Sequence, residues 1–353
     1  MTLAQHQPDT GPDAYLRDAI VESMRHAGDI SQLLRDGPQR WTDALLSEVR
    51  AHLSGCLNAV EVALGLQIGD SWLARPVEAL GPGYCRLAIE RHPAVLSPIL
   101  LDHLRLRAAA AFVLRMTLAA PFPPGEPDAP PPLSSRDEAL AEALTAYRLS
   151  VDPWLASHPL EWPMRADLTA EAYCDLVWSS AALLVEGLTA RMGVEHGAAM
   201  QIFSRAAEAI VARHDEQAGP FARAAYAAGL VRDAAEKAGL AEEAALSHDL
   251  LLLAALGSHD TGIAAEQALA LLVDGEDEER AALAHVLGLS DTGFVALLDA
   301  LAPVAETADD ALLPDIVAAY RLLTPDRAMA QLARWRGPVP LVTKLSRMGW
   351  TRP

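Results

Sequence analysis

Apolar residues recur at helical spacing along most of the chain. No long segment alternates apolar and polar residues, as a half-buried strand does. Aromatic residues make up 5% of the chain, and most of its apolar residues are Ala and Leu, which favour helices. The pattern predicts an all-α protein. Its clearest helix faces are Leu45, Val49, Leu53, Leu57, Val60 and Leu64; Leu140, Leu144, Tyr147 and Val151; and Phe294, Leu297, Leu298, Leu301 and Val304.

Breaks in this pattern predict how the chain is divided. The segment PFPPGEPDAPPPLSS at 121–135 is too rich in proline for a helix. Ser135 and Glu138 then fit a capping box that begins the next helix. We expect a disordered tail at 1–12, an N-terminal helical bundle at 13–120, a Pro-rich connection at 121–134, a helical-repeat region at 135–333 and a basic tail at 334–353.

The region after the connection is expected to repeat. Its helix pairs recur at roughly 30 residues, which favours an antiparallel HEAT-like array. Helices are expected near 195–214, 218–237, 240–256, 261–273, 278–287, 291–302, 310–322 and 325–335.

Two Asp-Thr-Gly triplets begin at Asp260 and Asp291. In aspartic proteases, two such carboxylates share a proton. Here the match extends to Gly257 and Gly288, which indicates a repeated helix–turn–helix unit. In this interpretation the glycines end one helix in the left-handed conformation, and the two aspartates cap the next helix. Caps one helix pair apart lie ~20 Å from each other, too far to share a proton.

Few other residues suggest chemistry. His248, in LSHDLLLL, is placed as a phosphotransfer histidine would be, and the alternative is a solvated position on a helix surface. The remaining histidines lack metal-site spacing, and no phosphate-binding loop or nucleophile elbow occurs. We therefore predict no catalytic residues, no metal and no cofactor. Trp154 and Trp162 are expected to be buried anchors at a bend.

Charge and composition restrict the partners and the compartment. A net charge of −19 disfavours nucleic acid, which needs a basic surface. The longest apolar runs fall short of the ~20 residues that span a bilayer. The N-terminus lacks the features of a signal peptide. Three scattered cysteines fit a reducing compartment. We expect a soluble cytoplasmic protein.

The C-terminal segment contrasts with the region before it. Residues 260–315 hold 13 acidic side chains against Arg280 alone, whereas residues 334–353 hold five basic ones and no acidic one. One hypothesis is that the tail lies extended on an acidic face of this chain or of a second copy, so a homo-oligomer is possible. Its anchors are then Trp335 and Trp350, with Arg334 and Arg336 as steering charges. The alternative is a loose, solvated tail.

Three runs carry a resemblance to a known family: DLTAEAYCDLVWSSAALLVEGLTARMG at 167–193, AAYAAGLVRDAAEKAGLAEEAALSHDLLLLAALGSHDTGIAAEQALALL at 224–272 and LSDTGFVALLDALAPVA at 289–305. They resemble a bacterial family catalogued as domain of unknown function 2336. That resemblance implies HEAT-type helical repeats and no assigned activity.

These observations leave three hypotheses for function. The first is a non-enzymatic protein-interaction scaffold or regulator, because a repeat array presents a long surface to a protein partner. The second is a phosphotransfer module that uses His248. The third is a helical bundle that binds a small ligand or lipid in an apolar cavity near the N-terminal helices.

Overall fold

The computed structural model describes residues 42–119, 137–155, 162–304 and 313–337. Within these ranges every regular element is a helix, so the all-α prediction is confirmed. The predicted connection at 121–134, Ser135 of the capping box and Trp350 lie outside the described residues.

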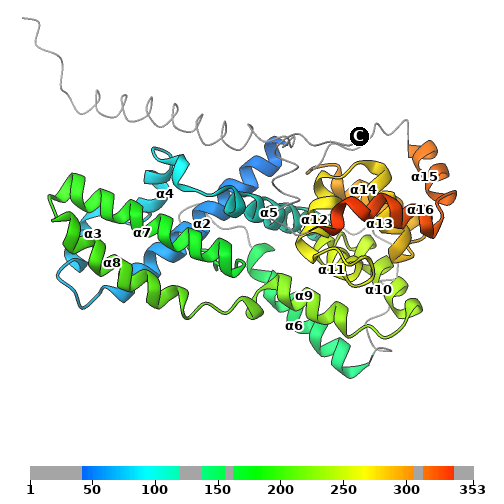
Figure 1. Ribbon diagram of the computed structural model, residues 1–353, viewed down its shortest axis with the longest axis horizontal. Coiled ribbons are helices and arrows are strands. Elements are labelled where there is room, and N and C mark those ends of the chain that lie inside the picture. The colour runs from blue at the N-terminus through cyan, green and yellow to red at the C-terminus, as the bar shows by residue number, and fades with distance from the viewer. Residues whose placement is uncertain (1–41, 120–136, 156–161, 305–312, 338–353) are drawn as a thin grey trace, which may run out of the picture.

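Figure 1 shows the order of the helices along an elongated molecule. The first part contains α2 (Asp43–Gln67), α3 (Ala74–Leu80), α4 (Tyr84–Ile89), η1 (Pro93–Val95), α5 (Pro98–Ala119), α6 (Glu138–Leu155), α7 (Ala170–Met192), α8 (His196–Val211) and η2 (Glu216–Ala218). The second part contains α9 (Pro220–Gly229), α10 (Ala234–Leu246), α11 (Leu250–Thr261), α12 (Ala265–Asp274), α13 (Asp277–Leu287), α14 (Asp291–Leu301), α15 (Leu313–Arg321), α16 (Pro325–Leu332) and η4 (Ala333–Arg336).

One group of helices forms around α2. This helix packs against α4, α5, α7 and α8, and α4 also packs against α7. The close approach of α4 depends on Gly187 of α7, where an added Cβ would lie 2.4 Å from the Tyr84 hydroxyl. The apolar stripe predicted from Leu45 to Leu64 is buried throughout, as predicted.

A second group forms around α11. This helix packs against α9, α10, α12 and α13, and every residue from Leu250 to Gly257 is buried. A helix that is apolar on all sides is stable only when neighbours surround it, which explains its central position. The helix α13 packs against α16, and α10 packs against α14.

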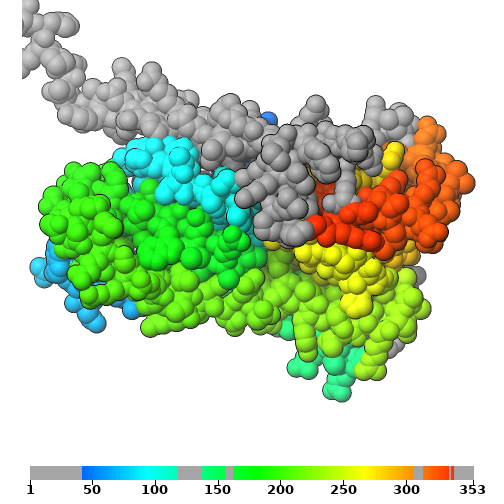
Figure 2. Space-filling view, in the orientation of Figure 1, coloured from blue at the N-terminus to red at the C-terminus, as the bar shows by residue number. Residues whose placement is uncertain are grey.

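The two groups occupy opposite ends of the molecule (Figure 2), and α5 and α6 connect them. The helix α5 contacts α2 and α7 in one group and α11 and α12 in the other, while α6 packs against α5 and α9. The sequence places α7 and α8 in the repeat region, yet both pack against α2. The contacts therefore run across the predicted connection at 121–134.

Two of the predicted helices are interrupted in the structure. The expected helix at 218–237 is interrupted after α9, and Asp233 caps α10 by accepting a hydrogen bond from the Glu236 N–H. The expected helix at 240–256 is likewise interrupted, because Asp249 caps α11 through the Leu252 N–H. In both cases the apolar pattern continues across the break, and an aspartate caps the N-terminus of a new helix within it.

A search of the described helices for one that is both long enough and apolar enough to cross a bilayer finds none.

Candidate functional site

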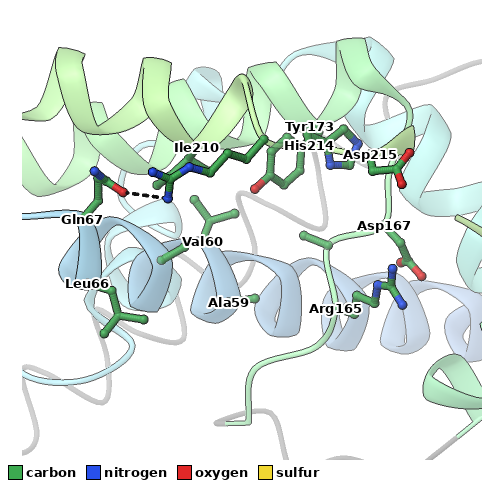
Figure 3. Close-up of a pocket in the computed structure, with 13 residues that line it drawn as sticks. Ala59, Val60, Leu66, Gln67, Arg165, Asp167, Tyr173, Ile210, His214 and Asp215 are labelled. Carbon is green, nitrogen blue, oxygen red and sulfur yellow. Dashed lines mark hydrogen bonds between the residues drawn. The ribbon is translucent and has the colours of Figure 1, made fainter. Parts of the chain in front are cut away.

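A groove of about 640 Å³ lies between α2, α7 and the end of α8 (Figure 3). The segment that precedes α7 closes one end of it through Arg165, Ala166 and Asp167. Sites for small molecules in proteins usually have volumes of roughly 300–1,000 Å³. The groove is therefore large enough to hold a ligand.

The floor of the groove is apolar. Ala59, Val60 and Ala63 of α2 line one side. Ile210 of α8 lies opposite Val60 (Figure 3). Positions 59 and 63 are one helical turn apart and share a face. Because both carry only a methyl group, α2 leaves space there that the larger side chains of its buried stripe would fill.

Two exposed arginines line the groove. Arg213 follows the end of α8, and its Nη1 donates a hydrogen bond to Gln67 Oε1 at 3.3 Å (Figure 3). The Arg165 guanidinium makes no hydrogen bond or ion pair with any described residue; only its backbone carbonyl is engaged, by Arg107 Nη2 at 2.9 Å. In a chain of net charge −19, two cations in one groove produce a local field that favours an anion.

One of the two acidic residues that line the groove is already neutralised. Asp167 is buried and forms an ion pair with Arg107 at 3.1 Å. The Trp154 Nε1 donates to both of its carboxylate oxygens, at 3.1 and 3.2 Å. The Arg107 guanidinium also lies 4.9 Å from the centre of the Trp154 ring. Asp167 therefore contributes little negative field to the groove.

Tyr173 and His214 stack against each other at the same end. Their ring centroids are 3.9 Å apart and the rings are nearly parallel, at 11°. His214 Nε2 lies 2.8 Å from the Leu168 carbonyl, which can only accept, so Nε2 carries the hydrogen. Burial raises the pKa of the Tyr173 phenol, which stays protonated and able to donate. The neighbouring Asp215 accepts from the Gln217 N–H and caps η2.

Together these residues can hold an anion attached to an apolar body. The groove offers two guanidinium groups, a phenol and an apolar floor. Among the described residues no three His, Cys, Asp or Glu side chains are grouped as metal ligands.

His248 does not lie on a helix surface, so that prediction is wrong. It occupies the turn between α10 and α11 with a φ of +57°, a left-handed conformation that is uncommon for a residue other than glycine. Its Nδ1 is 2.7 Å from Thr117 Oγ1, and burial lowers the pKa of the imidazole. The cap at Asp249 places His248 outside both helices.

Asp260 is not a helix cap, contrary to the prediction. It lies in the last turn of α11, where its carboxylate pairs with Lys237. The helix does not end at Gly257, where an added Cβ would lie 2.7 Å from Leu283 Cδ1. The missing side chain at Gly257 lets α11 pack closely against Leu283 of α13. The helix ends instead at Gly262, which has a φ of +68°.

Asp291 is the first residue of α14 and not its cap. Ser290 is the cap, since its Oγ accepts from the Gly293 N–H at 3.1 Å. The Asp291 carboxylate instead pairs with Arg321 at 2.6 Å. Gly288 ends α13 in the left-handed conformation, so that part of the prediction is confirmed. The two triplets therefore occupy opposite ends of their helices.

The first residues of the predicted tail are helical and not extended. Trp335 lies in η4, and its Nε1 donates to Glu279 Oε1 on α13 at 2.9 Å. Glu279 is fully buried, so Trp335 contacts an acidic residue of its own chain. Arg336 is exposed and its Nη2 lies 3.4 Å from Met329 Sδ, while Arg334 belongs to the same short helix.

Of the two tryptophans expected at a bend, Trp154 is buried and Trp162 is 62% exposed, so the prediction for Trp162 is wrong.

The sequence interpretation missed Arg165, Arg213 and Tyr173. They carry no common motif, and more than one helix separates each of them from Ala59 along the chain. One signal was present: the small residues Ala59 and Ala63 lie beside a stripe of Leu and Val on α2.

No protein-family model, no curated protein and no solved structure matches the chain. The resemblance to the helical-repeat family stays a prediction.

Proposed function

We propose that the protein acts by binding and not by catalysis, and that the groove along α2 is its ligand site. The observation that carries this proposal is a groove of about 640 Å³ with an apolar floor, lined by Arg165, whose guanidinium has no partner among the described residues. Ligand sites are typically lined by apolar side chains with a few well-placed polar groups, and in helical proteins they lie between helices. This supports the hypothesis of a small-ligand site near the N-terminal helices.

Filling the groove tests the proposal. Ala63→Phe places a ring on its floor, whereas Val62→Phe places the same ring at a neighbouring position that is 52% exposed and does not line the groove. We expect native mass spectrometry to find a small molecule bound to the wild type and to Val62→Phe, and to find it missing from Ala63→Phe. Equal retention by both variants would contradict the proposal, as would the absence of a bound molecule from all three proteins.

A protein-interaction scaffold is the second candidate, and one observation favours it. Leu66 lines the groove yet is 79% exposed, and an apolar side chain so placed at the rim is suited to cover by a partner. The HEAT-like stacking of helix pairs stays part of this proposal. Affinity capture with the wild type and with Leu66→Ser tests it, because a partner that covers the rim should be lost from the variant. A partner captured equally by the wild type and by Leu66→Ser would bind elsewhere on the protein. Leu66 would then no longer support the scaffold proposal.

A further inference from the structure

The Arg213 guanidinium donates its hydrogen bond in the groove to a weak acceptor, the Gln67 amide oxygen. Its contact with the Gln67 amide oxygen is 3.3 Å, longer than the roughly 2.7–2.9 Å of a hydrogen bond from a guanidinium to a carboxylate. Both side chains belong to exposed residues, so neither is held by burial. A guanidinium carries five N–H donors in a planar fork. The planar amide of Gln67 therefore occupies a position where a carboxylate would accept more strongly.

The floor beside Arg213 suits a straight apolar chain. From Gln67 to Ala59, α2 runs for about 12 Å at 1.5 Å per residue. Ala63, Val60 and Ala59 line the groove along this length, and Ile210 lies opposite Val60 (Figure 3). The two alanines leave a shallow track with apolar walls, which an unbranched chain can follow while water leaves the floor.

The charges around the track favour an anion over a cation. Asp167 is paired with Arg107 and Trp154, and Asp215 caps η2. The Arg213 and Arg165 guanidinium groups have no described carboxylate partner that offsets them. A cationic head group beside Gln67 would be repelled by the Arg213 guanidinium, whereas an anionic one would accept hydrogen bonds from it. Arg165 and Asp215 lie at the other end of the groove (Figure 3).

Resting on the proposed function, we infer that the ligand is a free monocarboxylate with an unbranched, medium-length apolar chain. Its carboxylate replaces Gln67 as the acceptor of the Arg213 guanidinium. Its chain lies on Ala63, Val60 and Ala59, against Ile210.

The test uses the full chain and three probes of equal chain length: octanoate, octanol and octylamine. Titration calorimetry should show that octanoate binds most tightly and octylamine least. Arg213→Gln should weaken octanoate binding about two- to fivefold, because Arg213 is exposed and water screens its pair with the carboxylate. Gln67→Ala should strengthen it about two- to fivefold, because the carboxylate no longer competes with the amide.

The control is Arg205→Gln, an exposed arginine of α8 that does not line the groove, and it should bind octanoate as the wild type does. Equal binding of octanoate to Arg213→Gln, or octylamine binding as tightly as octanoate, would overturn the inference. If Ala63→Phe loses a co-purified molecule that is a peptide or lacks a carboxylate, the inference fails and the proposed site stands. If Ala63→Phe binds octanoate normally, the groove itself is not the site.

Discussion

Buried charges in this protein are matched by nearby partners that the apolar pattern does not show. Arg107 and Asp167 pair inside the molecule, and Arg105 of α5 pairs with Asp274 of α12. The Glu61 carboxylate accepts hydrogen bonds from the backbone N–H groups of Gly83, Tyr84 and Cys85 at 2.7–3.1 Å. A buried charge is stable only when such partners are present. These contacts therefore fix how α5 lies against α12, how α4 lies against α2, and where the segment before α7 lies on α5.

His52 should make the protein less stable as pH falls. It is fully buried, and desolvation lowers its pKa from 6.5 to about 4, although the Glu48 carboxylate at 3.2 Å opposes this. Between these values the unfolded chain takes up a proton that the folded chain does not. Stability present above pH 6.5 is therefore lost as pH falls towards 4. A pKa lowered by this much corresponds to a loss of unfolding free energy on the order of 3 kcal/mol.

Replacing His52 by Leu should remove this part of the pH dependence, since Arg115 remains to pair with Glu48 at 2.5 Å. Urea unfolding at several pH values between 7 and 4.5 measures it. The exposed His92→Gln variant is the control and should keep the wild-type slope. A His52→Leu protein that loses as much stability as the wild type would show that other groups cause the acid sensitivity.

At the scale of the helix, apolar spacing predicted which segments are helical but not always where they end. The buried faces of α2, α6 and α14 could be predicted from periodicity, because the apolar stripe that becomes buried is visible in the sequence of each helix alone. The break at 247–249 did not follow, because Asp249 stops a pattern that is apolar on both sides of it. Gly257 was misread since its reason, contact with Leu283, lies on another helix.

The candidate groove could not be predicted from the spacing of apolar residues. Its residues come from α2, α7, α8, the turn after α8 and the segment at 165–167, and only the packing of these elements brings them together. The sequence hypothesis of a cavity near the N-terminal helices named the region but none of the polar side chains. Arg213 and Gln67 are far apart in the chain and meet only because α2 packs against α8.

The start of α14 gives a test at this scale. Ser290→Ala removes the hydroxyl that accepts from the Gly293 N–H, and a lost cap costs about 0.5–2 kcal/mol. Asp291→Ala should cost less, because its pair with Arg321 is exposed to solvent on both sides and is screened. Chemical denaturation of the two variants compares them. A larger loss from Asp291→Ala would restore the aspartate as the principal N-terminal group of the helix.

At the scale of the whole molecule, the predicted connection at 121–134 does not separate two sets of contacts. The helices α2 and α5 precede it and α7 and α8 follow it, yet they pack together. Arg107 lies before it and Asp167 after it, in a buried ion pair. The Met164 N–H donates to the Gly55 carbonyl at 2.8 Å across the same division. Both parts of the chain are needed to form the core around α2.

Cutting the chain within residues 121–134 at an inserted protease site should therefore leave one particle. We expect the two fragments to elute together in size-exclusion chromatography, at the volume of the uncut protein, and to separate only in denaturant. Asp167→Asn should make the cut protein come apart more readily, because a buried Arg107 without its partner charge costs about 3–5 kcal/mol. Asp175→Asn is the control: Asp175 accepts from the Ser97 N–H at a half-buried position, so the cut variant should hold together much as the wild type does. Fragments that separate without denaturant would mean that each half folds alone and that the division at 121–134 marks two independent units.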